Sequence, residues 1–141
     1  MEHRSPTRIL IVAYRTAATP RLIDAVRARA EGEACSFTLL LPRSYWDPDT
    51  EEASLTLELA VPLLADAAGG HVAGIIGDCD PFLAVKQALD RERFDEVIVS
   101  TLPEHVSHWL RRDLPHRIKQ LGVPVAVVTA KRSERPISDS T

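Results

Sequence analysis

Two patterns of hydrophobic residues alternate along the chain from Thr7 onward. Short continuous runs of leucine and β-branched residues are followed by longer segments in which apolar residues recur every three or four positions. The short runs are typical of strands buried on both faces, and the longer spacing is typical of helices that pack one face against a sheet. The predicted strands occupy residues 8–13, 35–41, 72–76, 96–99 and 123–129.

Capping residues and breakers set the limits of the helices between those strands. Thr19 and Asp80 are suitable N-cap residues, and each is followed by a proline. The first helical turn tolerates proline because the amide hydrogen that it lacks would have no partner there. The predicted helices occupy residues 20–30, 50–68, 82–91 and 103–121.

The second predicted helix carries apolar residues at a spacing of four. Asp49 or Thr50 is expected to cap its N-terminus, and Pro62 is expected to kink it or stop it locally. A stripe of this kind is typical of the face that a helix buries against a sheet. The stripe consists of Leu55, Leu59, Leu63 and Ala67.

Strand and helix segments alternate without an internal repeat or a linker. This order predicts parallel strands joined by right-handed crossovers, with helices on both faces. The fold class is therefore α/β, a three-layer doubly wound sheet of five parallel strands formed by residues 7–130. Residues 1–6 and 131–141 are polar or charged and lack apolar periodicity, so we expect them to be disordered. Ligands of such sheets bind beyond the carboxyl ends of the strands.

Composition and charge narrow the class of partner. The 141 residues are 45% hydrophobic and 26% charged, and the formal net charge is -3. This charge supplies no long-range attraction to nucleic acid or to an acidic membrane. No apolar run reaches the roughly 20 residues of a membrane helix, and Cys35 and Cys79 match no zinc or redox motif. We therefore expect a cytoplasmic protein that binds neither nucleic acid nor membranes.

Several common catalytic motifs are missing from the sequence. It contains neither G-x-G-x-x-G after the first strand nor G-x-x-x-x-G-K-[ST], so the glycines that bring a backbone close to phosphates are missing there. The end of the first strand, Ala13 to Arg15, lacks the clustered carboxylates of a phosphoacceptor domain. No serine lies in a G-x-S-x-G turn. We predict no catalytic residue.

Two histidines, His105 and His108, are three positions apart on the fourth predicted helix. This spacing places them on one face, where a metal pair is geometrically possible. No third ligand is spaced to complete the set, and imidazoles on a solvent-facing helix are common, so we predict no metal site.

Two further features admit both a functional and a structural interpretation. Arg111 and Arg112 could offer guanidinium donors to a phosphate near the start of the fourth helix, or they could be solvated. The Tyr45-Trp46 pair lies in a loop after the second strand, where it could cover a ligand or form an apolar lid over the strand edge.

The order of the segments resembles that of the universal stress protein family. The resemblance extends over about residues 7–129 and rests on four motifs taken together. These are Ile9-Leu-Ile-Val-Ala13, Gly77-Asp78 with Pro81 before a helix, Asp95-Glu-Val-Ile-Val99, and Gly122-Val-Pro-Val-Ala-Val-Val128.

This resemblance implies an adenine-nucleotide alpha-hydrolase-like fold with strand order 3-2-1-4-5. It also implies a homodimer formed through the fifth strand, and ATP binding in one subgroup of the family. The expected dimer contacts are Val123, Val125, Val127 and Thr129. An uncharged edge strand is also a physical motive for such pairing.

The family's ATP-binding pattern, G-2x-G-9x-G-[ST], would begin directly after the fourth strand. Here Ser100, Pro103 and Asp113 stand at the three glycine positions, and Leu114 follows. Proline has no amide hydrogen, and a carboxylate repels phosphate, so we predict that ATP is not bound in the standard way. Tyr14 stands where the family has an acidic residue, whereas Thr16 keeps the expected hydroxyl.

The predicted function is a non-catalytic binding or regulatory module of the universal stress protein type. The candidate ligand is an adenine nucleotide or a small anion, and an unidentified protein partner is possible. The alternative is a nucleotide-handling enzyme that uses Arg111 or Arg112 with His105 or His108. The candidate binding residues are Ala13, Tyr14, Thr16, Pro42, Arg43, Gly77, Asp78, Ser100, Thr101, Pro103, Arg111, Arg112 and Asp113. Ser100, Thr101 and Asp78 could instead only cap helices and tighten turns.

Overall fold

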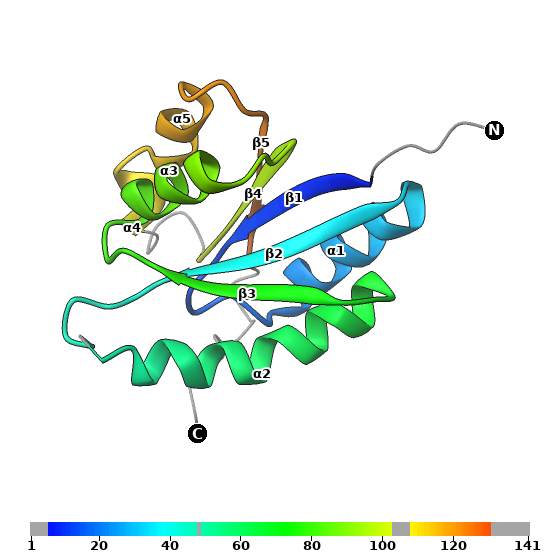
Figure 1. The fold of residues 1–141 in the computed structure, drawn as a ribbon, viewed down its shortest axis with the longest axis horizontal. Coiled ribbons are helices and arrows are strands. Elements are labelled where there is room, and N and C mark those ends of the chain that lie inside the picture. The colour runs from blue at the N-terminus through cyan, green and yellow to red at the C-terminus, as the bar shows by residue number, and fades with distance from the viewer. Residues whose placement is uncertain (1–5, 48, 103–107, 131–141) are drawn as a thin grey trace.

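The computed structural model describes residues 6–47, 49–102 and 108–130. Its sheet has five parallel strands in the order β3-β2-β1-β4-β5, which confirms the predicted architecture and order (Figure 1). The terminal segments 1–6 and 131–141, apart from Pro6, lie outside the described residues. The strands are β1 (Thr7–Val12), β2 (Cys35–Pro42), β3 (Val72–Gly77), β4 (Glu96–Thr101) and β5 (Val125–Thr129).

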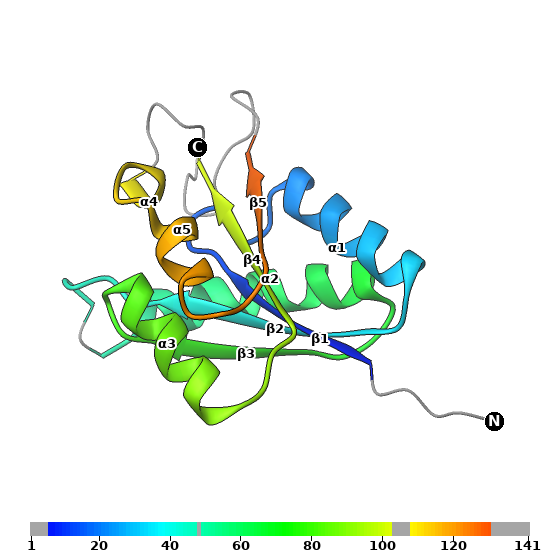
Figure 2. The same ribbon diagram turned by 90° about the horizontal axis from the view of Figure 1, so that it is seen from above.

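Helices cover both faces of the sheet. Figure 2 shows α1 and α2 on one side and α3, α4 and α5 on the other. None of the helices in the described part of the chain combines the length and apolarity that a membrane crossing requires. The helices are α1 (Pro20–Gly32), α2 (Glu51–Ala68), α3 (Pro81–Arg91), α4 (His108–Arg111) and α5 (Leu114–Lys119).

The central strand β1 is buried on both faces, as its continuous apolar run predicts. Ile9 and Ile11 belong to the core shared with α1 and α2, whereas Leu10 and Val12 belong to the core shared with α3 and α5. All four side chains are fully inaccessible to solvent. The alternation follows from the strand geometry, in which successive side chains point to opposite faces.

The leucine stripe of α2 does not face the sheet, so that prediction was wrong for all its leucines. Leu55, Leu59 and Leu63 are 61%, 59% and 48% exposed. The side that packs inward carries mostly small residues, and the lack of a side chain at Gly74 of β3 leaves room for Leu57 of the helix. A Cβ added at Gly74 of β3 would lie 3.0 Å from a Leu57 methyl group. The buried residues of α2 are Ala53, Thr56, Ala60, Leu64 and Ala67.

The start of α2 also differs from the prediction. Neither Asp49 nor Thr50 caps it, because the side chain of Asp47 does. One Asp47 oxygen, Oδ2, accepts hydrogen bonds from the amides of Glu52 (3.1 Å) and Ala53 (3.2 Å). Thr50 takes a left-handed conformation with φ of 61° and forms no side-chain cap. The helix continues through its internal proline to Ala68 without stopping.

The described part of the fourth predicted helix, from residue 108 onward, is divided into two short helices. α4 ends at Arg111, and Asp113 adopts a left-handed conformation with φ of 57° before α5 begins. The physical reason is Pro115, which lacks an amide hydrogen and whose ring would collide with the carbonyl four residues earlier in a continuous helix. At the start of α5 the same proline is tolerated.

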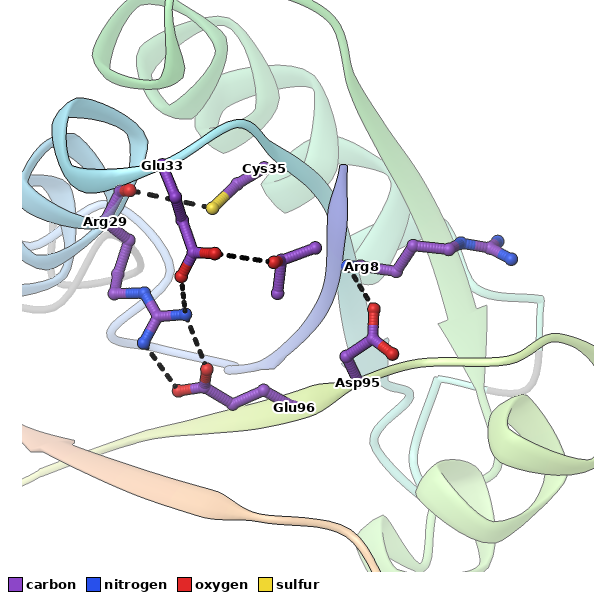
Figure 3. Close-up of polar contacts among 7 residues, drawn as sticks. Arg8, Arg29, Glu33, Cys35, Asp95 and Glu96 are labelled. Atoms are coloured by element: carbon purple, nitrogen blue, oxygen red, sulfur yellow. Dashed lines mark hydrogen bonds and ion pairs between the residues drawn. The ribbon is translucent and has the colours of Figure 1, made fainter. Parts of the chain in front are cut away.

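Charged residues join the elements at the amino-terminal end of the sheet (Figure 3). The Arg29 guanidinium lies between Glu96 at the start of β4 (2.7 Å) and Glu33 after α1 (3.2 Å). Asp95 accepts a hydrogen bond from the Arg8 amide (2.8 Å). These contacts tie α1, β1 and β4 together at the end of the molecule opposite the cleft described next.

Candidate functional site

A cleft of about 580 Å³ lies beyond the carboxyl ends of β1 and β2, where the topology predicts a ligand site. Its walls come from segments far apart in the sequence: the loop after β2, the turn before α3, and the α4–α5 pair. The lining residues are Tyr14, Pro42, Arg43, Ser44, Tyr45, Trp46, Cys79, Asp80, Pro81, Trp109, Arg112, Leu114 and Arg117.

Aromatic side chains make up part of the lining. The rings of Tyr45 and Trp46 meet edge to face, with centroids 5.0 Å apart. Both are largely exposed, at 79% and 58%. Trp109 of α4, half-buried, also lines the cleft. Exposed aromatic faces at a cleft are suited to stacking on a planar ligand.

A hydrogen-bond cluster fastens the loop that carries this aromatic pair. The Tyr14 hydroxyl donates to Glu52 Oε1 (2.8 Å) and accepts from Ser44 Oγ (2.8 Å). Trp46 Nε1 donates to the other oxygen of Glu52 (3.0 Å). Burial raises the pKa of Tyr14, and Glu52 acts in the same direction, so the phenol stays protonated and donates at neutral pH.

Among the described residues that line the cleft, positive side chains outnumber negative ones. They include Arg43, Arg112 and Arg117, and Asp80 is the one carboxylate in that described set. That carboxylate accepts from the amides of Phe82 (2.9 Å) and Leu83 (3.4 Å) as the cap of α3. Guanidinium groups pair with phosphate and carboxylate groups through two parallel hydrogen bonds, so this charge balance favours an anion.

Arg117 is positioned by an aromatic ring. Its guanidinium carbon lies 4.4 Å from the centre of the Phe82 ring on α3, the range of a cation–π contact. The break at Asp113 sets α5 against α3, which places Arg117 at the cleft.

The predicted hydroxyl groups of Thr16 and Ser100 come together, but neither residue is among those that line the cleft. Thr16 Oγ1 and Ser100 Oγ lie 2.7 Å apart, and each residue is 2% exposed. Thr101 Oγ1 lies 3.4 Å from Thr129 Oγ1 on β5. The Ala13 side chain is fully buried. These side chains join β1, β4 and β5 and do not line the cleft.

The remaining predicted residues lie elsewhere. Gly77 and Asp78 line a second hollow of about 310 Å³ together with Arg43 and Arg91. Asp78 Oδ1 accepts from the Asp80 amide (2.9 Å), which tightens the turn before α3. Asp113 is exposed at the helix break and is not among the residues that line the cleft. Pro103, His105 and the side chains of His108 and Arg111 lie outside the described residues.

Four predicted binding residues line the cleft, and others that line it were missed. The predicted ones are Tyr14, Pro42, Arg43 and Arg112. The Tyr45-Trp46 pair, for which the sequence left open a ligand cover or an apolar lid, also lines the cleft. Trp109 and Arg117 were missed because both lie on the fourth predicted helix, which was taken as continuous, and Arg117 reaches the cleft only through the break at Asp113.

The edge strand β5 carries the predicted dimer contacts, and the dimer stays a prediction. Val127 is 44% exposed, whereas Val123 and Val125 are half-buried against the core shared with α3 and α5. The strand begins at Val125, so Val123 precedes it. Thr129 lies beside Thr101.

The parallel sheet of order 3-2-1-4-5 with helices on both faces is a doubly wound α/β fold, and universal stress proteins have a similar fold. A universal stress protein from Archaeoglobus fulgidus has a similar structure with a TM-score of 0.63 and 15% sequence identity, over 86% of this chain and 93% of that one. No family model matches the chain, and no curated protein matches its sequence.

Two other solved structures of this fold contain nucleotides. A universal stress protein in complex with cAMP has a TM-score of 0.64 and 13% identity, over 91% of this chain and 100% of that one. A universal stress protein family protein from Arabidopsis thaliana with AMP bound has a TM-score of 0.60 and 13% identity, over 90% and 94% of the two chains.

Proposed function

We propose that this chain is a divergent universal stress protein that acts as a non-catalytic binding or regulatory module. Its cleft takes a nucleoside monophosphate, and it does not hold ATP in the standard way. The observation that carries the proposal is the presence of three arginines and several aromatic side chains in one cleft of about 580 Å³.

The size and chemistry of the cleft support a ligand with one planar ring system and one phosphate. Small-molecule sites generally measure roughly 300–1,000 Å³ and combine apolar walls with a few placed polar groups. Trp46 and Trp109 offer surfaces for a base, and the guanidinium groups of Arg43 and Arg112 suit a phosphate. The cAMP and AMP complexes among the structural neighbours support the same ligand class.

The backbone after β4 is poorly suited to a triphosphate. Ser100 is buried and bonded to Thr16, and Pro103 has no amide hydrogen to donate. Asp113 keeps the left-handed conformation that favours glycine, but it adds a carboxylate. The negative charge at this position disfavours a chain of phosphates.

The polar groups of the cleft support binding more than catalysis. The Asp80 carboxylate is occupied as a helix cap, and the phenol of Tyr14 is held protonated by burial. No histidine is found among the described residues that line the cleft. These residues therefore lack a free general base of the kind that nucleotide hydrolysis uses.

The test is the binding of AMP, cAMP, ATP and inorganic phosphate to the full chain, measured by calorimetry and thermal shift. We expect AMP or cAMP to raise the melting temperature and to bind more tightly than ATP and phosphate. Arg112→Ala should weaken AMP binding roughly tenfold, since one charge-assisted contact is lost. Arg27→Ala is the matched control, because Arg27 pairs with Asp24 on the surface of α1.

Two results would contradict the proposal. One is ATP affinity higher than that for AMP, and the other is no binding of any nucleotide. Turnover of AMP or ATP, lost in His108→Ala, would instead favour the alternative of a nucleotide-handling enzyme.

A further inference from the structure

The outward side of α2 is an apolar surface with no covering element in the described part of the chain. Leu55, Leu59 and Leu63 lie at a spacing of four, and they are 61%, 59% and 48% exposed. This spacing places the three side chains in one row on the helix. We call this row the α2 leucine row. In Figure 1, α2 runs along the border of the molecule beside the edge strand β3.

The α2 leucine row is not needed to hold the helix on the sheet. A different side of α2 buries Ala60, Leu64 and their neighbours in the core shared with α1. The helix is therefore apolar on two sides, although only one of them packs. A polar outward side is usual for a surface helix, and contiguous exposed apolar side chains mark interaction surfaces.

Carboxylates border the α2 leucine row. Glu51 precedes Leu55 by four positions, Glu58 follows it by three, and Asp66 follows Leu63 by three. These separations place each carboxylate one turn from a leucine of the row. All three acidic residues are exposed. From Glu51 to Gly70 the sequence contains no lysine, arginine or histidine.

We propose that the α2 leucine row is the docking site for an amphipathic helix of a partner protein that combines leucine-like residues with lysines or arginines. The apolar side of such a helix would cover the leucines, and its cations would meet the carboxylates of Glu51, Glu58 and Asp66. This inference is independent of the ligand proposed for the cleft.

A second copy of the chain fits this surface less well. Pairing two α2 helices would bring their carboxylates together, with no basic residue on either helix to compensate. The dimer predicted from the family resemblance uses β5, which lies at the opposite edge of the sheet from β3. That dimer would leave the α2 leucine row open.

The test uses synthetic helical peptides of about 18 residues, the length of α2, measured by fluorescence anisotropy with the full chain. The first peptide carries leucines along one side and lysines along the other. A second has glutamates in place of the lysines, and a third has the leucines scattered around the helix. We expect only the first to bind, with an affinity that falls as salt is added.

Variants of the chain locate the binding surface. Leu59→Ser should weaken binding of the lysine peptide at least roughly tenfold. Glu58→Lys leaves the leucines in place, and it should weaken the lysine peptide and strengthen the glutamate peptide. Leu83→Ser is the matched control, because Leu83 is an exposed leucine (41%) on α3, on the other face of the sheet. AMP binding should not change in any of these variants.

Three results would overturn the inference. The first is no binding of the lysine peptide at concentrations up to about 1 mM. A dissociation constant above that concentration would be too weak for specific recognition. The second is an equal loss of binding in Leu59→Ser and Leu83→Ser. The third is a wild-type dimer, seen by light scattering, that Leu59→Ser dissociates, because a second copy would then cover the row.

Discussion

Tyr14 stands where the resemblance to universal stress proteins leads one to expect an acidic residue, and the structure gives it a different role. Its hydroxyl joins Ser44 to Glu52, and Glu52 in turn holds the indole of Trp46. A single phenol at the end of β1 thereby positions the aromatic loop over the cleft. A carboxylate at this position would face Glu52 and repel it.

Tyr14→Phe should lower the free energy of unfolding at neutral pH by about 1 kcal/mol, because Ser44 and Glu52 lose their partner. Burial, the main cause, raises the pKa of Tyr14 in the folded protein. The stabilisation is therefore complete below the ordinary tyrosine pKa of about 10 and is lost as pH rises through the higher folded value. Urea unfolding at pH 7 and above pH 10 measures both effects.

The control for this substitution is Tyr45→Phe, because Tyr45 is mostly exposed. It should change stability little at either pH. If the wild type and Tyr14→Phe lose the same stability between pH 7 and a pH above 10, ionisation of the Tyr14 hydroxyl does not contribute to that loss.

At the scale of the elements, the start of α2 depends on two residues with opposite effects. Asp47 accepts from two amides of the first turn, whereas Thr50 is strained in a left-handed conformation with φ of 61°. Loss of an N-cap generally costs about 1 kcal/mol, and a non-glycine residue in the left-handed region costs roughly 1–2 kcal/mol.

Asp47→Ala should therefore destabilise the protein by about 1 kcal/mol, and Thr50→Gly should stabilise it by a similar amount. Thermal unfolding of the two variants beside the wild type measures both. Asp49→Ala is the control, since the exposed Asp49 does not cap the helix. If Asp49→Ala destabilises as much as Asp47→Ala, the capping described above is incorrect.

The break of the fourth helix shows how much a single proline decides. Pro115 could have been used to predict two helices instead of one, because proline inside a helix removes a hydrogen bond and collides with the preceding turn. The consequence for the cleft is large. Arg117 lies at the cleft, against Phe82 of α3, because α5 starts from Asp113 in a new direction.

At the scale of the whole molecule, the dimer through the edge strand β5 is a prediction of the family resemblance. We expect Val127→Lys to shift a dimer to monomers in light scattering, because a lysine on an edge strand opposes strand pairing. Val127 is a better position than Val125, which packs against the core and would affect stability as well.

Leu83→Lys on α3 is the control for this experiment, because Leu83 is exposed and lies away from β5. An unchanged mass of Val127→Lys would count against pairing through β5. A wild type that is monomeric at micromolar concentration would count against any dimer.

The candidate site was predictable in its location but only partly in its residues. The carboxyl ends of parallel strands meet at one rim, so Tyr14, Pro42 and Arg43 follow from the strand boundaries alone. Thr16 and Ser100 lie near the same rim, yet their hydroxyls bond to each other and do not line the cleft. They are 84 positions apart, and no pattern along the chain reveals their contact.

By itself, the sequence determined the alternation of strands and helices along the chain, and with it a parallel sheet. The reason is that continuous apolar runs, helical spacing and turn residues are local patterns of the sequence. Only the tertiary structure decided which side of α2 packs, since that helix is apolar on two sides and Gly74 of β3 leaves room for Leu57 on one of them. It also decided that Trp46, Trp109 and Arg117 share one cleft, because their proximity depends on how three separate segments fold over the rim.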